Sequence, residues 1–574
     1  MSLIAGAFAL SSHLDDAPAL AQKLESCWRR QPEDHLQLVC GDGFVAAHLT
    51  LPGHAGHCTS KGGIWTLLAG EPLSDSQNGD ARLGELLRSS WVVNAEPALS
   101  SCEGDFALVQ VEPSQGRLRL AVDKFGLRSL YYGIAHDVLF FATSMRALLH
   151  LCPSLGDRAD IAGQSQKVAL GYCLGAHTPY AAVRVVEPAQ MVEVRKGKLS
   201  ASYYFDWSGI EPFTGTEDEF AQALHRAFLD SVDSRARDEE ACVAYLSGGL
   251  DSRCLTAALL TLGKPVDTIN YAPAGSEDAT LGRLAAAALG TRHFEFPEGA
   301  LDFWDRGIES YLAWQGVPRT HEVRPAPMRV WAGFGGDTVM APTNVSESVA
   351  AALGKDDSRG AIAAFLARAG TAPSGWVMKP AWRARFSEEL LQSIAAEIQR
   401  MGIADARRGF HTFLVLNEPR GVLARHFEEL DERPLRYILP FLDTRVVALA
   451  LSGRLEWLLR HRFYYRWLNE FQVAVKSVPW QAYPWSLPCP LPAPPGLRRQ
   501  WESGWFSASD QRRAEEILID CVRDDLRRPG FPVQILNRKA IIAAYGLACI
   551  GVRRYLYMLR VARDFVQMAA KSYD

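Results

Sequence analysis

The sequence predicts two domains of mixed class: an N-terminal β-rich domain of α+β type, then a C-terminal α/β domain built on a doubly wound parallel sheet with many helices. Two observations support this prediction. From Ala241 onward, short apolar runs alternate with glycine-containing turns and helix-length segments, which is the pattern of βα units. The segment from Ser208 to Glu217 is rich in Gly, Pro and Thr, as expected of a linker. We therefore expect domains at 1–207 and 218–574.

The second domain is expected to be helix-rich after Pro342. The segment from Pro479 to Pro495 differs, because its seven prolines favour a stiff, extended chain. One interpretation is a surface connector. The other is that Trp480, Tyr483 and Trp485 form a wall of a groove through which a peptide enters.

The first βα unit joins an apolar run, Ala241 to Leu246, to a helix expected from Arg253 to Leu262. A Ser-Gly-Gly turn between them lets backbone N–H groups approach an anion, and the helix N-terminus adds partial positive charge. The hydroxyls of Ser247 and Ser252 can donate to phosphate oxygens. Asp251 would repel a triphosphate unless a cation lay between them, and Mg²⁺ meets that need. The other interpretation is an ordinary glycine-rich turn with a capping Asp and Ser.

Further βα units favour the phosphate interpretation. A second strand is expected at Val266–Tyr271, a helix at Ala279–Leu289 and a third strand at His293–Phe296. The apolar run Val330–Ala332 then leads into Gly333-Phe334-Gly335-Gly336-Asp337, which repeats the glycine loop and the carboxylate. Ligands of doubly wound sheets lie at the carboxyl ends of the strands. The two loops would therefore supply two carboxylates to one Mg²⁺–pyrophosphate.

The motif Ser-Gly-Gly-Leu-Asp-Ser at 247–252 resembles the pyrophosphate loop of the ATP-pyrophosphatase superfamily. Its pairing with the Gly-Phe-Gly-Gly-Asp loop at 333–337 resembles the synthetase domain of class B asparagine synthetases and their relatives. In the first domain, the blocks at 104–107, 120–132 and 141–144 resemble the glutaminase-like domain of that family. The resemblance thus covers nearly the whole chain and implies an Ntn-hydrolase-like sandwich before the ATP-pyrophosphatase domain.

The glutaminase-like domain departs from the family pattern at its reactive residue. Active members expose an N-terminal cysteine, whose thiolate attacks the glutamine amide with the chain's own amine as base. This position is Ser2 here, and the Asn-Gly-Glu segment that would hold glutamine is Ala69-Gly70-Glu71. Serine is a nucleophile in other hydrolases of this kind. The loss of nucleophile and pocket together nevertheless predicts an inactive domain that is kept for structure or docking.

The synthetase domain departs from the family in its C-terminal part. The block Leu439-Pro440-Phe441-Leu442-Asp443 matches, but the acidic residue that asparagine synthetases place four positions before the proline aligns with Arg436. The lysine that stabilises the transition states in the family is not recognisable. Lys476, Arg462 and Lys539 are candidates for its role, and each also fits a solvated basic residue on a helix.

This pattern most resembles the lasso-peptide cyclases, whose glycine loop is followed by a variable polar stretch, here Thr338 to Ser348. The resemblance implies that the protein adenylates an Asp or Glu side chain of a precursor or core peptide. The peptide's N-terminal amine would then close an isopeptide ring, with release of AMP. A leader peptidase and a leader-recognition protein are the partners that the resemblance implies. An asparagine synthetase or a β-lactam synthetase-type amide ligase is the alternative within the family.

The same resemblance implies a site for ATP as substrate and Mg²⁺ as cofactor. The catalytic candidates are Lys476 and Arg462, and the metal ligands are Asp251 and Asp337. The ATP-binding residues expected are Leu246, Ser247, Gly248, Gly249, Leu250, Asp251, Ser252, Ile269, Ala332, Gly333, Gly335 and Gly336.

Composition restricts other classes of function. The chain has 574 residues, 48% of them hydrophobic, and a net charge of −4, so it has no basic excess for a nucleic-acid partner. A nucleotide-modifying ATP pyrophosphatase, such as a tRNA thiolase, would need reactive cysteines near the loop, where only Cys242 and Cys254 occur. The eleven cysteines include no Cys-x-x-Cys pair, as expected of reduced thiols in the cytoplasm.

Targeting and membrane segments are not expected. The apolar stretch Leu3–Leu10 lacks a basic region before it, and Ile541–Gly551 is shorter than the ~20 residues of a membrane span. We therefore expect a soluble, cytoplasmic protein. His54, His57 and Cys58 could suggest a metal site, but a single such cluster in a Gly-rich loop favours a structural role.

Overall fold

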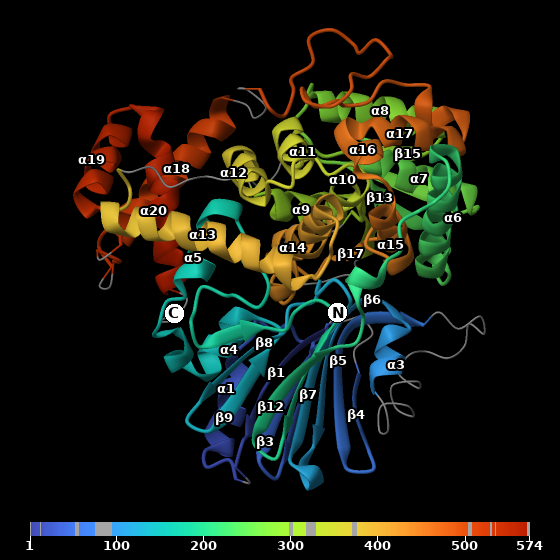
Figure 1. Ribbon diagram of the computed structural model, residues 1–574. Helices are drawn as coiled ribbons and strands as arrows, with labels where there is room; N and C mark the ends of the chain where they lie inside the picture. Colours follow the sequence, from blue (N-terminus) through green and yellow to red (C-terminus); the bar gives the residue numbers. More distant parts are fainter. Residues whose placement is uncertain are drawn as a thin grey trace.

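The computed structural model of the protein describes residues 2–11, 13–51, 57–74, 95–297, 302–316, 329–369, 376–502, 508–528, 531–533 and 535–570. Two antiparallel six-stranded sheets form the N-terminal part, and a five-stranded parallel sheet lies among helices in the C-terminal part (Figure 1). The predicted fold class is therefore confirmed.

The N-terminal sheets stack through a shared apolar core. Ile4 and Phe141 of one sheet pack with Leu67 and Val109 of the other, and all four are buried. The first sheet has the order β10 (Val183–Val185), β8 (Tyr131–Ala135), β9 (Val138–Ala142), β1 (Ser2–Ala9), β3 (Phe44–Thr50), β2 (His35–Gly41). The second has the order β12 (Lys198–Tyr203), β11 (Gln190–Arg195), β7 (Arg117–Val122), β6 (Cys102–Glu112), β5 (Ile64–Ser74), β4 (His57–Lys61). Helices of this part are α1 (Ala17–Ser26), α3 (Ala95–Ser100), α4 (Met145–Leu151) and α5 (Ile161–Leu170).

Residues 208–217 connect β12 to the first long helix of the C-terminal part. Within them, the backbone N–H of Phe213 donates to the carbonyl of Ser452. Thr216 and Glu219 then form a capping box, which fixes the helix start at Glu217.

The C-terminal sheet is parallel throughout, because each strand returns through a helical crossover. Its order is β15 (Arg292–Glu295), β14 (Val266–Asn270), β13 (Cys242–Tyr245), β16 (Arg329–Trp331), β17 (Arg436–Ile438). The chain thus moves outward from β13 to β15 and then returns to the other side of β13. This reversal places a topological switch point between β13 and β16, where such sheets bind ligands.

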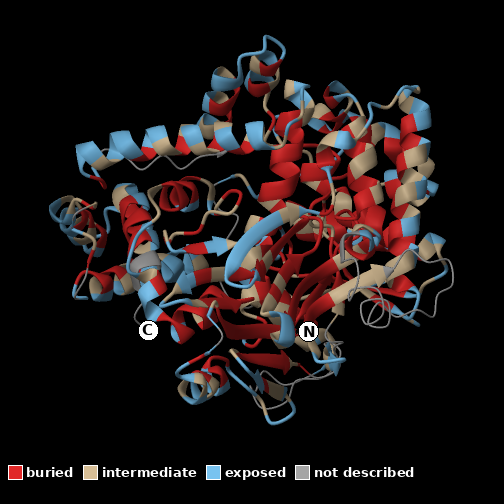
Figure 2. Cartoon of the chain, turned by 60° about the horizontal axis from the view of Figure 1, so that its bottom comes forward, coloured by how far each residue is buried: buried red, intermediate tan, exposed pale blue. Residues whose placement is uncertain are grey.

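Helices flank this sheet, and those after residue 508 form a separate apolar core with α5 of the N-terminal part. Their inner faces are buried and their outer faces are exposed (Figure 2). No described helix is both long and apolar enough to cross a bilayer. The helices are α6 (Glu217–Ala236), α7 (Asp251–Thr261), α8 (Glu277–Leu289), α9 (Phe303–Trp314), α10 (Gly336–Val339), α11 (Glu347–Leu353), α12 (Ser358–Ala369), α13 (Pro380–Arg400), α14 (Ala406–Glu428), α15 (Thr444–Ser452), α16 (Leu455–Leu458), α17 (Arg462–Trp467), α18 (Ala508–Asp525), α19 (Arg538–Cys549) and α20 (Leu556–Ala570).

The proline-rich segment 479–495 contains no helix or strand. Its start is fixed by Arg253 of α7, whose buried guanidinium donates to the carbonyls of Val478 and Pro479 at 2.9 Å each. The segment is therefore more than a surface connector, since it is attached to the helix that follows the first glycine loop.

Candidate active site

Two glycine loops meet at the switch point. β13 and β16 are hydrogen-bonded neighbours, with Ala244 opposite Trp331, so the loops after these strands emerge side by side. A Cβ atom at Gly336 would lie 2.5 Å from Cγ of Asp251, and one at Gly333 would lie 2.9 Å from its Cβ. Only glycine allows this contact, which presses the second loop against the first.

The first loop folds back over the start of α7. The backbone N–H of Ser247 donates to Oγ of Ser252 at 3.0 Å, and the two hydroxyl oxygens lie 2.9 Å apart. The N–H of Gly249 donates to the Ser247 hydroxyl at 3.2 Å. Asp278 of α8 accepts from the N–H of Gly248. The predicted cradle is thus a closed turn whose donors are held by neighbouring side chains.

Asp251 and Asp337 form a half-buried acidic pair, one carboxylate from each loop. Burial, together with the charge of Asp337, raises the pKa of Asp251 from 3.8 to about 8. Burial likewise raises the pKa of Asp337. Tyr464 of α17 donates to Oδ1 of Asp251. In the part of the chain that the structure describes, no Lys or Arg forms an ion pair with either carboxylate.

Such a pair suits a hard divalent cation. Carboxylate oxygens are the ligands that Mg²⁺ uses, and the ion would remove the repulsion that the two charges impose on each other. Over the described ranges, no group of three or more His, Cys, Asp or Glu side chains is arranged to hold a metal alone. The remaining ligands would be phosphate oxygens and water, as is usual for Mg²⁺ with a nucleotide.

A third carboxyl, Glu418 of α14, lies beside this pair and was not among the predicted residues. Burial and the charge of Asp337 raise the pKa of Glu418 to about 7. Asn344 donates to its Oε1 at 2.7 Å. Glu418 is far from both loops in sequence, and the only local signal is Pro419, a proline inside a helix.

The other predicted nucleotide residues lie at the strand ends. The carbonyl of Ile269 accepts from the N–H of Leu246 at 2.9 Å, which joins the ends of β14 and β13. The N–H of Ala332 donates to the carbonyl of Ile438 at 3.1 Å. Gly335 has φ +86°, a left-handed conformation that favours glycine. Leu250, the residue immediately before α7, is buried.

The predicted catalytic cations lie elsewhere. Lys476 is exposed and donates to Asn469 at 2.7 Å. Arg462 is exposed and pairs with Glu217 at 3.0 Å. It precedes Tyr464 by two helical positions, so it points to a different face of α17. Lys539 is exposed on α19. No described hydrogen bond or ion pair joins these three side chains to the acidic pair, and their catalytic role stays a prediction. Their motif is degenerate, and the packing of α17 decides which of its side chains faces the loops.

Two further sequence signals have structural explanations. The thiols of Cys242 and Cys254 are buried; burial raises the pKa of Cys242 to about 12 and that of Cys254 well above its usual value. Cys58 on β4 is also held protonated by burial. His54 lies outside the described residues.

The candidate glutaminase site is closed. Ser2 is 1% exposed, and its hydroxyl donates to the carbonyl of Leu68, as does Nε2 of His48. Glu71 forms an ion pair with Arg436 of β17. Asp105 pairs with Arg128 at 2.7 Å and with Arg436 at 3.3 Å. An arginine of the C-terminal part thus lies among the acidic groups of the N-terminal one.

Comparison with known proteins agrees with both halves of this architecture. A family model described as a glutamine amidotransferase domain matches residues 82–205, and one described as asparagine synthase matches residues 223–322. Asparagine synthetase 1 of Bacillus subtilis is 25% identical over 36% of this chain and 33% of its own length. Asparagine synthetase 3 of the same organism is 24% identical over 35% and 34%. The chain thus spans about a third of the length of these curated relatives.

A solved structure of a glutamine phosphoribosylpyrophosphate amidotransferase from B. subtilis also matches. It is 13% identical and covers 58% of this chain and 74% of its own, with a TM-score of 0.25.

Proposed function

The chain belongs to the asparagine synthetase-like family, with a glutamine amidotransferase domain before an asparagine synthase domain, and we propose that it is an ATP-dependent amide ligase that forms AMP and pyrophosphate. The observation that carries this proposal is the acidic pair Asp251–Asp337 at the switch point, beside two glycine loops and with no ion pair to any described Lys or Arg.

The loops would hold the triphosphate so that its α-phosphorus faces a substrate carboxylate. Three groups of the first loop would donate to its phosphate oxygens: the hydroxyls of Ser247 and Ser252 and the N–H of Gly249. Mg²⁺ held by Asp251 and Asp337 would offset the charge that develops on the leaving pyrophosphate. A carboxylate oxygen attacks the α-phosphorus, the bond to the β-phosphate oxygen breaks, and an acyl-adenylate and pyrophosphate result.

An amine then attacks the acyl carbon, loses a proton and displaces AMP. We assign the proton acceptor to Glu418, because its pKa of about 7 matches the operating pH of a general base. Asn344 fixes its carboxyl. Orientation would supply much of the acceleration, since effective molarities reach ~10⁵ M or more when reacting groups are held together.

The amine could come from glutamine or from the substrate itself. Ser2 is buried and bonded to a backbone carbonyl, and Glu71 is paired with Arg436, so release of ammonia from glutamine is not supported. An amine of the substrate itself is the simplest replacement. We therefore propose a macrolactam synthetase of the lasso-cyclase type, which activates an Asp or Glu side chain of a peptide and joins it to the N-terminal amine.

Two alternatives make different demands. An asparagine synthetase would use aspartate with glutamine or ammonia. A nucleotide thiolase would need a reactive thiolate near the loops, and burial holds both neighbouring thiols, Cys242 and Cys254, protonated. The second alternative is therefore the less supported.

Exchange of labelled pyrophosphate into ATP tests the proposal. The purified full chain with Mg²⁺-ATP should catalyse exchange when given a linear peptide with a free N-terminal amine and an internal Asp or Glu. The product should lose the mass of one water, and the same peptide with an acetylated amine should give exchange without ring closure. Exchange with aspartate instead, followed by asparagine formation from ammonia, would assign the protein to the asparagine synthetases.

A further inference from the structure

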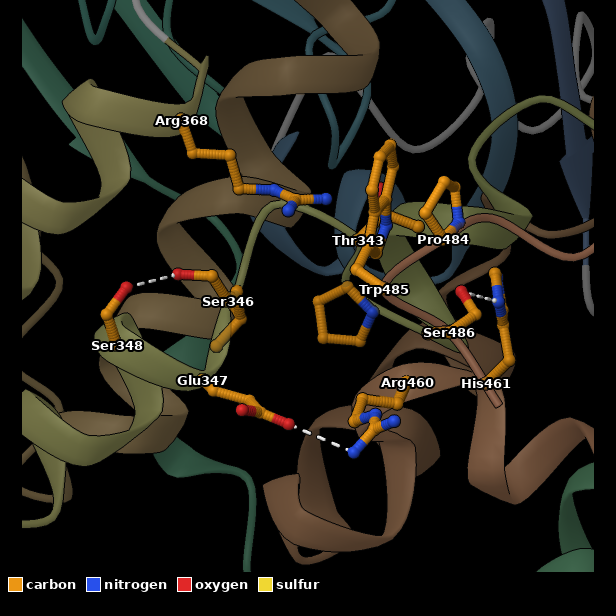
Figure 3. A pocket seen from close by; sticks show the side chains of 13 residues that line it. Thr343, Ser346, Glu347, Ser348, Arg368, Arg460, His461, Pro484, Trp485 and Ser486 are labelled. Atoms are coloured by element: carbon orange, nitrogen blue, oxygen red, sulfur yellow. Dashed lines mark hydrogen bonds and ion pairs between the residues drawn. The ribbon is translucent and has the colours of Figure 1, made fainter. Parts of the chain in front are cut away.

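A cavity of about 390 Å³ opens beside the second glycine loop (Figure 3). Its walls are the 341–348 segment, Arg368 at the end of α12, the 460–461 corner and the 484–486 segment. None of its described lining residues belongs to the first glycine loop, 246–252. It is therefore distinct from the phosphate cradle.

The cavity nevertheless adjoins the acidic pair. The N–H of Gln481 donates to the carbonyl of Gly248 at 2.8 Å, so the proline-rich segment starts at the first loop. Burial and the charges of Asp337 and Asp251 raise the pKa of Tyr483. The Tyr483 ring stacks on Trp485, with ring centres 5.0 Å apart and planes at 5°. One aromatic layer thus lies between the acidic pair and the cavity, whereas Trp480 is buried away from it against Tyr465.

The charges that line the cavity do not balance. Glu347 and Arg460 neutralise each other at 2.9 Å. His461 is neutral, because burial lowers its pKa to about 4, and its Nδ1 lies 2.7 Å from the Ser486 hydroxyl. Arg368 extends into the cavity over the Trp485 ring, 4.2 Å from the ring centre (Figure 3). Across the described ranges, it has no carboxylate partner.

The guanidinium of Arg368 is positioned to bind a planar anion. The contact with the indole limits the motion of the guanidinium, and no described residue forms a hydrogen bond with its N–H groups. These N–H groups match the two oxygens of a carboxylate. Because Arg368 is partly desolvated, a bound carboxylate would restore the neutrality of the cavity.

We propose that this cavity binds a carboxylate of the substrate through Arg368, and that this is a second carboxylate, distinct from the one that is activated. This inference rests on the proposed function in taking the bound molecule to be the substrate of the ligase. The carboxylate site itself rests on the geometry of the cavity. The acceptor molecule then presents one carboxyl to the α-phosphate and another to Arg368, with Trp485 between Arg368 and the acidic pair. This second contact fixes which of several acidic groups is adenylated.

Calorimetric titration of the full chain with glutarate tests the site without ATP. Glutarate should bind, and neutral glutaramide should not. Arg368→Met should weaken glutarate binding by about tenfold or more, because a hydrogen-bonded charge contact is lost. Arg460→Met is the matched control: it removes the same charge from the same cavity, but its guanidinium already pairs with Glu347, so the loss should be smaller. Unchanged binding of Mg²⁺-ATP in both variants shows that they fold.

The outcomes separate this proposal from the proposed function. Equal losses in the two arginine variants, or glutaramide binding as well as glutarate, would overturn the site. Inorganic phosphate binding more tightly than glutarate would assign the cavity to a phosphate group instead. If glutarate binds as expected but no peptide supports pyrophosphate exchange, the carboxylate site stands and the ligase assignment fails. With an active peptide, Arg368→Met should raise KM and leave kcat within about twofold, as expected for uniform binding.

Discussion

The molecule contains two groups of partly buried acids that differ in their charge partners. In the N-terminal part, Glu71 and Asp105 are paired with Arg436, and Asp105 also with Arg128. At the switch point, Asp251 and Asp337 face each other without a described cation, and Glu418 adds a third carboxyl.

The presence or absence of an arginine partner distinguishes acids with a structural role from acids with a chemical role. A carboxylate paired with an arginine in the protein interior holds two elements together. Removal of one partner leaves the other as an unpaired charge away from water. A partly buried carboxylate without a cationic partner is kept at a cost in stability, and perturbed acids of this kind cluster at functional sites. The N-terminal group therefore fastens the two halves of the chain, and the second group is available for a metal ion and a substrate.

The largest effect is expected from neutralising the second group. Asp337→Asn or Asp251→Asn should lower pyrophosphate exchange by ~10²–10³-fold or more, because each removes a charge that stabilises the leaving group. In the metal-free protein above pH 8, where Asp251 is ionised, the same variants should raise the midpoint of thermal unfolding, since the repulsion between the two carboxylates is removed. Near-normal exchange in either variant would refute the metal site.

Glu418 extends the comparison from the metal to the proton. Glu418→Gln should lower kcat for amide formation by ~10²-fold or more, which is the usual contribution of a general base. In the unmodified protein, kcat should rise with pH as Glu418 loses its proton, and Mg²⁺ beside Asp337 should move this rise below the pKa of about 7 that burial and the charge of Asp337 give the metal-free group. Pyrophosphate exchange, which precedes the proton transfer, is the internal control and should stay within about twofold. An unchanged pH profile in the variant would exclude this role.

Removal of the arginine that fastens the halves should act on stability instead. Arg436→Met leaves Glu71 and Asp105 without this partner, and breaking such a buried pair costs about 3–5 kcal/mol. Urea unfolding, followed by tryptophan fluorescence and by circular dichroism, measures the loss. Arg462→Met is the matched control, because its pair with Glu217 is on the surface and is worth about 0–1 kcal/mol. Equal stabilities of the two variants would contradict the fastening role.

The stability of the protein should also depend on pH through Asp251. The folded state binds the proton of Asp251 more tightly than the unfolded chain does, because its pKa is about 8 in place of 3.8. The contribution of Asp251 to stability is therefore complete below pH 3.8 and is lost as the pH rises toward 8. The metal-free protein should lose stability over this range, and Asp251→Asn should lose less. Added Mg²⁺ should bind more weakly as the pH falls below 8, since protons compete for the same oxygens.

The smallest effect is expected at the former nucleophile position. Ser2→Ala should leave peptide-dependent pyrophosphate exchange within about twofold and stability within about 1 kcal/mol, the usual value of one hydrogen bond. Hydrolysis of glutamine, followed as glutamate release, should be absent before and after the change. A loss of glutamine-dependent product in Ser2→Ala would show that the N-terminal part still supplies ammonia.

The parallel sheet, the two glycine loops and the acidic pair could all be predicted from the sequence. These features are encoded locally: an apolar strand, a glycine turn and a helix start follow one another within eleven residues from Ala241 to Asp251. Helix α8 begins at Glu277 rather than at Ala279 because Ser276 caps it, which is a difference of boundary only. Local chemistry of this kind survives in any tertiary context.

The distant side chains that join those loops could be identified only in the folded molecule. Glu418 and Tyr464 reach the acidic pair because α14 and α17 pack there, and Arg462, two positions from Tyr464, faces α6 instead. Arg436 appeared in the sequence as the loss of an acid, and the structure shows what it does, since it pairs with acids that are far away in the chain. The same holds for Arg368 and Trp485, which line one cavity from separate segments. Contacts of this kind depend on helix packing and on the balance of buried charge. Neither can be predicted from a local sequence pattern.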